Sequence, residues 1–389
     1  MKEYNRREFL GLTAGMGLLE VSEAQYTPGA GLQAKREKVI IDRVETIKVV
    51  VPPKKNIINS AKIGEDETSG FWKGYKSIIK LYGDNGFIGL GETGRYYPEE
   101  EFEKNKQFLK GKDVFSLNFS HPTFGLPYQS SSAAFEMAIF DLAGKTSGVP
   151  VYQLLGGKRQ DKVAVAYWTG RQTGEDMQNV ARKAWEMGYK GFKYKQRPGD
   201  SMIEQVRDIT KGAPEIKIVI DPNQHFTDIN DFLRQAKQLK GFNIECIEDP
   251  MPKDVATYVR LNEELDIPLA MHTDDLSLIT RAIKAGACQI FNLGGDMRTF
   301  VRLCHIVDAW GFKCWHGSGN EIGVQDASYV HAIAATSNCV IPSDVLGYLI
   351  RVDDLLIKTF KVENGFATVP DDPGLGVELD EDAVKKYRV

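Results

Sequence analysis

The sequence predicts an α/β barrel of parallel strands that follows a smaller α+β block. Three observations predict this fold. Alternating and continuous β-branched runs with a tight turn fill the first part of the chain, from about Val39 to Phe87. From Val163 the sequence pattern changes to short apolar strands separated by helical stretches. Polar residues end one strand after another, as catalytic side chains do at the mouth of a barrel.

Composition sets the broad class. The chain has 389 residues, of which 42% are hydrophobic and 10% aromatic, so it can bury a large core. The net charge is only −4 and no basic block stands out, which argues against a nucleic-acid or membrane-surface partner and favours a small-molecule substrate. The five cysteines are odd in number and show no C-x-x-C spacing, so we expect buried free thiols.

The N-terminal segment, residues 1–36, is interpreted as a signal and linker. Arg6 and Arg7 precede an apolar run from Phe9 to Leu19, which resembles a twin-arginine export signal and is too short to span a bilayer. This pattern predicts a protein that is exported to the periplasm. The alternative is an ordinary N-terminus with two chance arginines, in which case the protein is cytoplasmic.

The α+β block follows this segment. Its strands lie within residues 39–87, with a turn at Gly83–Gly86, and the long polar stretch 52–74 between them is a predicted loop. Helical patterning follows in residues 98–111 and 131–148. The last stretch, residues 362–387, is too short for a domain of its own, so we expect it to pack back on this block.

Eight predicted strands make up the barrel, with strand ends roughly 20 to 30 residues apart, the length of one βα unit. They are VAVAYW (163–168), GFKYK (191–195), IKIVIDP (216–222), IECIEDP (244–250), PLAMH (268–272), QIFNL (289–293), KCWHG (313–317) and CVIPSDV (339–345).

Charged and polar side chains end these strands and should therefore surround one mouth. They are Lys193, Lys195, Asp221, Asn223, Glu248, Asp249, His272, His316 and Asp344. Asp221 and Glu248, on adjacent strands, can converge on a hard divalent cation such as Mg²⁺. Lys193 and Lys195 are two apart and share one face of their strand. Crowding these like charges beside a cation favours loss of a proton, so Lys195 can act as a base.

A metal-bound carboxylate substrate fits this set. The ion would stabilise the enediolate that forms when the α-proton is removed. His316, across the barrel, can serve the opposite face as a second base, or as the acid that expels a β-hydroxyl.

The chain resembles the enolase superfamily, in its mandelate racemase and muconate lactonising branch. The resemblance runs from about Val39 to Tyr387. It rests on GFIGLGETG, FEMAIFDLAGK with PVYQLLGGK, GFKYK, DPNQ, IEDP and VPDDPGLGVELD.

The resemblance implies a (β/α)7β barrel, a modified TIM barrel, over residues 161–354. It also implies a capping domain over 37–160, completed by 355–389, whose loop from Lys54 to Lys73 selects the substrate. It implies Mg²⁺ and no organic cofactor, with Lys195 as the base and Lys193 as its electrostatic partner. Dimers or octamers built on the capping domains are expected from the family.

The chain departs from the family pattern in two places. In PLAMHTDD, where a third metal ligand is usual, His272 occupies the ligand position, with Asp274 as the alternative. Imidazole is softer than Mg²⁺ prefers, so Mn²⁺ or another divalent ion also fits. In FNLGGDMRT the acid that usually pairs with the seventh-strand histidine is missing, and Asp296 is the nearest candidate partner of His316. The missing acid weakens the hypothesis that the protein is a racemase, because a racemase needs two bases.

The predicted reaction is a lyase reaction on a sugar acid, because WHGSGNEIG and MRTFVRLC look most like acid-sugar dehydratases. Proton abstraction is followed by loss of hydroxide in a dehydratase, or by loss or migration of a ring ether oxygen in a cycloisomerase. A racemase or epimerase is the first alternative, and an inactive exported binding protein is another. A Schiff-base aldolase is disfavoured by the carboxylates on strands three and four. Asn223, His225 and Asp344 are candidate auxiliary residues.

Overall fold

The computed structural model describes residues 38–54, 57–66, 70, 72–121 and 123–389. The predicted export signal lies outside these described residues. The N-terminal part begins with a three-stranded antiparallel sheet in the order β1 (Ile41–Val49), β2 (Lys76–Gly83) and β3 (Ile88–Glu92). The turn between β2 and β3 lies at the predicted glycines, and Gly86 adopts the left-handed φ of 85° that this turn requires.

Two helices complete this layer, α3 (Glu99–Leu109) and α4 (Ser132–Ser147). The α4 helix lies directly on β3, and two glycines of β3 allow this close approach. A Cβ added to Gly89 would lie 2.1 Å from the carbonyl oxygen of Ala138, and one added to Gly91 would lie 2.1 Å from that of Ala134. The glycines of the GFIGLGETG motif therefore let the backbones of β3 and α4 meet.

The second part is a curled parallel sheet of seven strands, and its fold confirms the predicted barrel. The strands are β5 (Tyr167–Thr169), β6 (Gly191–Lys195), β7 (Lys217–Asp221), β8 (Ile244–Glu248), β9 (Leu269–His272), β10 (Ile290–Leu293) and β11 (Lys313–His316). Each strand pairs with the next along the chain. The eighth predicted segment makes only isolated parallel bridges, Cys314 with Cys339 and Val165 with Ser343.

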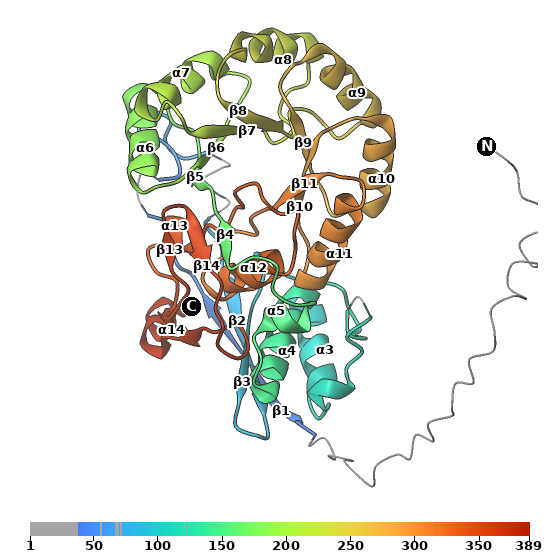
Figure 1. The fold of residues 1–389 in the computed structure, drawn as a ribbon. Helices are drawn as coiled ribbons and strands as arrows, with labels where there is room; N and C mark the ends of the chain where they lie inside the picture. Colours follow the sequence, from blue (N-terminus) through green and yellow to red (C-terminus); the bar gives the residue numbers. More distant parts are fainter. Residues whose placement is uncertain (1–37, 55–56, 67–69, 71, 122) are drawn as a thin grey trace, which may run out of the picture. The chain divides into compact units, whose positions relative to one another are not determined.

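Helices alternate with these strands and surround the sheet (Figure 1). They are α6 (Gly174–Glu186), α7 (Met202–Gly212), α8 (Ile229–Ala236), α9 (Val255–Glu264), α10 (Leu276–Ala285), α11 (Met297–Asp308) and α12 (Val324–Ala334). Four of them, α8, α9, α10 and α11, begin at an aspartate whose side chain accepts a hydrogen bond from a backbone N–H of the first turn. These caps fix where each helix begins after its strand, and so where the intervening loop lies.

The remaining elements are short. They are η1 (Val114–Ser116), α5 (Val151–Leu154), β4 (Lys162–Ala164), η2 (Lys237–Leu239), α13 (Gly347–Ile350), β12 (Leu356–Lys358), β13 (Val362–Glu363), β14 (Phe366–Thr368), β15 (Glu378–Leu379) and α14 (Glu381–Tyr387). The end of the chain lies against the N-terminal sheet. Lys80 Nζ of β2 is 2.6 Å from Glu381 Oε1, and the Val50 N–H donates to the Tyr387 carbonyl oxygen at 2.9 Å.

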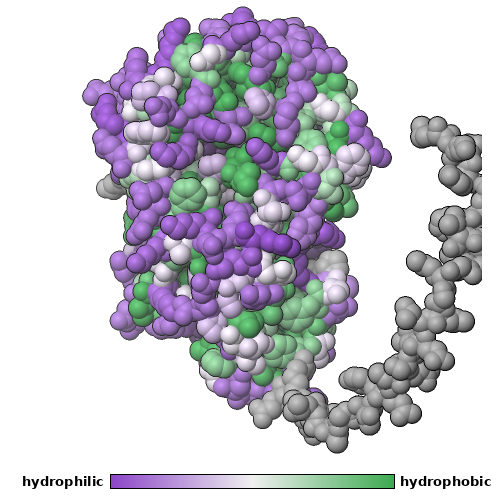
Figure 2. All heavy atoms as spheres, viewed as in Figure 1, coloured by the Kyte–Doolittle hydropathy of each residue, from purple (hydrophilic) through white to green (hydrophobic). Residues whose placement is uncertain are grey.

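On the face drawn in Figure 2, hydrophilic residues predominate and apolar residues form small groups. The longest runs of apolar residues lie in the protein core, along β2 and the barrel strands. Residues such as Ile79 and Ile220 are fully buried there. Within the described residues, none of the helices combines the length and the apolar character needed to cross a membrane.

All five cysteines are free and buried, which leads to a first prediction. Thiol titration of the native protein with an aromatic disulfide reagent should give almost no reaction, and titration after unfolding should give five equivalents. Burial excludes the reagent and raises the thiol pKa values, that of Cys288 to about 12, so little thiolate is present. Fast reaction of a native thiol, or fewer than five equivalents after unfolding without reductant, would contradict this.

Candidate active site

The site lies where the barrel strands end. Lys195, Asp221, Glu248, His272 and His316 are the last residues of β6, β7, β8, β9 and β11. In a parallel sheet these carboxyl ends lie at one edge, which explains why residues far apart in sequence meet there. A cavity of about 200 Å³ opens at this edge. Its lining residues are Trp72, Arg95, Trp168, Lys193, Lys195, Asp221, Asn223, Glu248, His272, Asn292, Ser318, Asn320, Asp344 and Leu346.

The two lysines of GFKYK both point into this cavity and are almost fully buried. Lys195 lies opposite Asp221 in the register of β6 and β7, and its Nζ donates to Asp221 Oδ2. Lys193 Nζ lies 2.6 Å from Glu248 Oε2, 2.6 Å from Asp344 Oδ2 and 3.5 Å from Asp221 Oδ2. The two lysines therefore share Asp221 of the third barrel strand, and Lys193 also contacts Glu248 of the fourth.

Charge pairing outweighs burial in setting the pKa values of Lys193 and Asp221. Burial alone would lower the pKa of Lys193, but Asp344, Glu248 and Asp221 hold that pKa well above the ordinary lysine value. Burial would likewise raise the pKa of Asp221, but Lys195 and Lys193 hold it below the ordinary aspartate value. Lys193 is thus a fixed positive charge beside Asp221, as expected of an electrostatic partner.

Glu248 is oriented from two sides. Its Oε2 meets Lys193, and its Oε1 accepts a hydrogen bond of 2.7 Å from the Asn292 amide of β10. His272 Nδ1 lies 3.9 Å from the same Oε1. The His272 side chain is 41% exposed at the mouth of the barrel. Desolvation by the surrounding protein, and next the positive charge of Lys193, lower the pKa of His272 to about 4. The imidazole is therefore neutral, the form in which histidine binds metals.

The oxygen atoms of the cavity supply some of the ligands that a hard divalent ion needs. Asp221 and Glu248 supply one carboxylate each from adjacent strands, and the buried Oδ1 of Asn223 has no hydrogen-bond partner among the described residues. In the described part of the chain, no three His, Cys, Asp or Glu side chains form a group of metal-binding size. Mg²⁺ is commonly held by one or two carboxylates plus water and substrate oxygens, so two carboxylates suit it.

The third predicted ligand stays a prediction. His272 faces the cavity with Asp221 and Glu248. Asp274, the alternative, is exposed and lines a second cavity of about 500 Å³ beside the first. The two cavities share Arg95, His272 and Ser318 in their walls. Of the two candidates, His272 is therefore the one that the fold places with the carboxylates.

His316 is not brought to the cavity that holds the lysines. It lines the second cavity, and its ring is packed between Phe300 and Tyr329, with centroids 4.4 and 3.8 Å away. Its Nδ1 lies 2.7 Å from the Gly317 carbonyl oxygen, and burial lowers its pKa to about 3. The ring is therefore neutral with the proton on Nδ1. Its Nε2 is buried and has no hydrogen-bond partner within the described part of the chain.

The suggested acid partner of His316 has another role. Asp296 caps α11, where its side chain accepts from the Thr299 N–H at 2.8 Å. It lines the second cavity with His316, but no hydrogen bond joins the two among the contacts of the described residues. The imidazole is oriented by the Gly317 carbonyl instead of by a carboxylate.

Of the three auxiliary candidates, two lie in the cavity. Asp344 anchors Lys193 and lies 3.4 Å from the Trp315 indole nitrogen. Asn223, with a left-handed φ of 50°, donates its N–H to Asp221 Oδ1. His225 is exposed, does not line either cavity, and bonds through Nδ1 to the Pro222 carbonyl.

Sequence reasoning missed several cavity residues. They are Arg95, Trp168, Asn292, Ser318, Asn320 and Leu346, whereas Trp72 lies in the loop from Lys54 to Lys73 that was predicted to select the substrate. Asn292 and Trp168 had a usable signal, because each lies near the end of a predicted barrel strand. Trp72 and Arg95 come from the N-terminal part, and their position depends on how that part covers the barrel. The arrangement offers a divalent ion two carboxylate ligands, Asp221 and Glu248, and places Lys195 beside them as the candidate base.

Comparison with known families gives two matches. Residues 73–156 match the model of the mandelate racemase and muconate lactonizing enzyme N-terminal domain. Residues 176–383 match the model described as enolase C-terminal domain-like, which is more than half of the chain. The two matches correspond to the two parts of the fold.

Individual relatives differ in the reactions that they are named for. The o-succinylbenzoate synthase of Bacillus subtilis (strain 168) is 27% identical over 333 residues, 80% of this chain and 88% of that protein. The D-xylonate dehydratase of Haloferax volcanii is 25% identical over 394 residues, 89% and 93% of the two chains. A crystal structure of muconate lactonizing enzyme from Pseudomonas fluorescens, complexed with muconolactone, is 25% identical with a TM-score of 0.73, covering 91% of this chain and all of that one (100%). These identities do not single out one reaction.

Proposed function

The chain belongs to the enolase superfamily, in its mandelate racemase and muconate lactonizing branch, and from this premise we propose a lyase that acts on a sugar acid. Its reaction class is metal-dependent abstraction of the proton α to a carboxylate, catalysed by an enzyme of the lyase and isomerase group. The single observation that carries the proposal is the pairing of Lys195 with the Asp221 and Glu248 cluster in one cavity.

The residues have distinct roles in this proposal. Asp221 and Glu248 would hold a divalent ion, Mg²⁺ or Mn²⁺, which would supply positive charge beside the substrate carboxylate and so acidify the α-proton. Lys195 takes the α-proton at Nζ. Lys193, fixed by three carboxylates, keeps a positive charge at the base of the cavity and stabilises negative charge that develops on the substrate. Trp72 and Trp168, in edge contact with centroids 5.6 Å apart, keep water from one wall.

β-Elimination from a sugar acid is supported by the walls of the cavity. Ser318, Asn320 and Asn292 are polar but uncharged, and such groups hydrogen-bond hydroxyls. The named dehydratase relative also acts on a sugar acid. Loss of a β-hydroxyl gives a dehydratase, and loss or migration of a ring ether oxygen gives a cycloisomerase.

A racemase or epimerase is the second candidate, and one observation favours it. The ring of His316 is neutral, and its Nε2 has no hydrogen-bond partner among the residues that the structure describes, which is the state a second base needs. His316 lines the neighbouring cavity, so a substrate would have to extend across the shared wall at His272 and Ser318 to use it. This separation makes the lyase the better supported candidate.

Two further proposals concern the context of the enzyme. We propose that residues 1–36 direct export to the periplasm, because of the paired arginines and the apolar run that follows them. We also propose a homo-oligomer, a dimer or an octamer, by analogy with the family. Size-exclusion chromatography with light scattering on the mature chain and cell fractionation of the full chain test them.

Proton NMR in D₂O tests the main proposal. The mature protein is incubated with Mg²⁺, and separately with Mn²⁺, and a panel of aldonic, aldaric and anhydro-sugar acids, beside a Lys195→Ala control. The expected result is a vinylic or 2-keto-3-deoxy product that is absent with Lys195→Ala, because that variant has no base at Nζ. Deuterium incorporation at the α-carbon without a product would replace the lyase by an epimerase. No change of any acid with either metal would overturn the proposal of a sugar-acid substrate.

A further inference from the structure

We propose that Asn320 is a substrate-binding residue, whose side-chain amide hydrogen-bonds a hydroxyl group of the substrate. We further propose that two buried cations, Lys76 and Arg351, are positioning residues that hold Asn320 in the conformation this contact needs. This inference rests on the proposed function, because it assigns a polyhydroxy acid to the same cavity. It concerns a loop residue after β11 that lies in the WHGSGNEIG segment, but to which the sequence analysis assigned no role.

The backbone of Asn320 is fixed at both of its polar groups. Its carbonyl oxygen accepts hydrogen bonds from Lys76 Nζ at 3.1 Å and from Arg351 Nη2 at 2.8 Å. Its N–H donates to Ser318 Oγ at 3.0 Å. The residue has a left-handed φ of 61°, a region that is unfavourable for most L-residues and that asparagine tolerates better than most of them. The two cations thus stabilise a backbone shape that is otherwise unfavourable.

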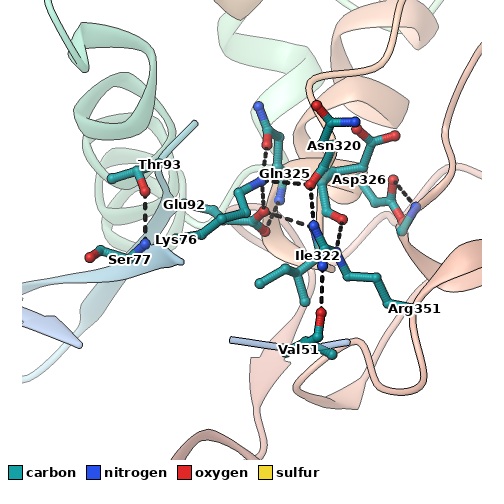
Figure 3. Close-up of polar contacts among 12 residues, drawn as sticks. Val51, Lys76, Ser77, Glu92, Thr93, Asn320, Ile322, Gln325, Asp326 and Arg351 are labelled. Atoms are coloured by element: carbon teal, nitrogen blue, oxygen red, sulfur yellow. Dashed lines mark hydrogen bonds and ion pairs between the residues drawn. The ribbon is translucent and has the colours of Figure 1, made fainter. Parts of the chain in front are cut away.

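Lys76 is itself held rigidly. Its side chain is 1% exposed, and its Nζ lies 2.5 Å from Glu92 Oε1 and 2.7 Å from Gln325 Oε1. Glu92, fully buried, in turn accepts the backbone N–H groups of Ile322 and Gln325 at 2.7 and 3.0 Å. The ion pair of β2 and β3 therefore fixes the barrel loop on both sides of residue 321 (Figure 3).

Arg351 connects two walls of the cavity. It is 2% exposed and donates to four backbone carbonyl oxygens. Two of these belong to Val51 and Trp72 in the N-terminal part, and two belong to Asn320 and Glu321 in the barrel loop. One guanidinium thereby sets the separation between Trp72 and Asn320, which both line the cavity.

The side chain of Asn320 is available to a molecule bound in the cavity. In Figure 3 it extends away from the two cations that hold its carbonyl oxygen. It lines the cavity with Lys195, Asp221 and Glu248, and its amide makes no hydrogen bond among the contacts of the described residues. An amide offers both a donor and an acceptor, and a hydroxyl group can use both. The competing explanation is that asparagine is present only because it tolerates a positive φ.

An Asn320→Gly variant separates the two explanations. Glycine accepts the positive φ without strain, so the loop and both cations keep their contacts while the amide is removed. We expect kcat/KM for the best acid of the panel to fall about 10- to 100-fold, the loss typical of an unmet polar contact, with an unchanged melting temperature. On an analogue that lacks the bound hydroxyl, found by testing the monodeoxy acids in turn, the variant and the wild type should be equal.

The positioning role of Arg351 has its own readout. Arg351→Lys should raise KM more than it lowers kcat in the wild type, and should change KM little further in the Asn320→Gly background. A purely structural role would give the same change in both backgrounds, and would overturn this part of the inference.

The outcomes also separate the inference from the proposed function. If the wild type turns over a sugar acid and Asn320→Gly does so equally well, the inference is overturned and the proposed function stands. If the wild type neither exchanges an α-proton nor, in calorimetry with Mg²⁺, binds D-gluconate or another acid of the panel, the proposed function fails and the inference fails with it.

Discussion

Replacing Glu248 with glutamine is expected to lower turnover at least about a thousandfold and to abolish stoichiometric binding of a divalent ion. The variant removes one of the two carboxylates that the fold places together, and a neutral amide is a poor substitute for an anionic ligand. A thousandfold loss corresponds to about 4 kcal/mol of transition-state stabilisation, which is within what a bound metal ion supplies. Rates are measured by the NMR assay, and bound metal by mass spectrometry of the desalted protein.

The fold of this variant should survive. Lys193 keeps its contact of 2.6 Å with Asp344, so the buried ammonium is not left alone. Glu245→Gln is the matched control, because Glu245 lies on the same strand and pairs with Lys217, a residue that is 56% exposed. This control should keep both activity and metal. Full metal binding by Glu248→Gln would exclude Glu248 as a ligand.

Replacing Lys76 with methionine is expected to lower the free energy of unfolding by about 3–5 kcal/mol, the cost of leaving a buried charge unpaired. Glu92 would lose its ion-pair partner while it is fully buried, and the Asn320 carbonyl and the Gln325 amide oxygen would each lose a donor. The midpoint of guanidinium unfolding, followed by circular dichroism, measures the loss.

The control for this variant is an ion pair of the same type at the surface. Lys217→Met removes the partner of Glu245, at 2.6 Å, but the lysine is 56% exposed, so we expect a loss of only about 0–1 kcal/mol. Equal losses for the two lysines would mean that the Lys76 and Glu92 pair is no more important to the fold than a surface pair.

The sequence predicted the parts of the site that follow from strand periodicity. Lys193 and Lys195 were expected on one face, and Asp221 and Glu248 on neighbouring strands, because alternation and the parallel register are properties of the local chain. The structure places all four around one cavity. The same reasoning placed His316 at the seventh strand end, where it lies.

The sequence did not predict which cavity each side chain faces. His316 turns towards Phe300 and Tyr329 because those rings enclose it, and their positions depend on how α11 and α12 pack. His225 follows a predicted strand end but continues outward to the surface. The role of Asn320 depends on a single backbone angle that is stabilised by residues more than 240 positions earlier in the chain and 31 positions later. Such distant partners leave no local pattern.

The four carbonyl bonds of Arg351 also bear on how this protein could be recombined with its relatives. A hybrid that combined a foreign N-terminal part with this barrel would place a buried guanidinium against backbone that did not evolve to receive it. The backbone at residues 51 and 72 would have to keep its path, and Lys76 and Glu92 would have to be exchanged together with the loop from Asn320 to Gln325 and with Arg351. These side chains and the loop therefore form one structural unit, and a loop graft designed for a new substrate should transfer or keep that unit as a whole.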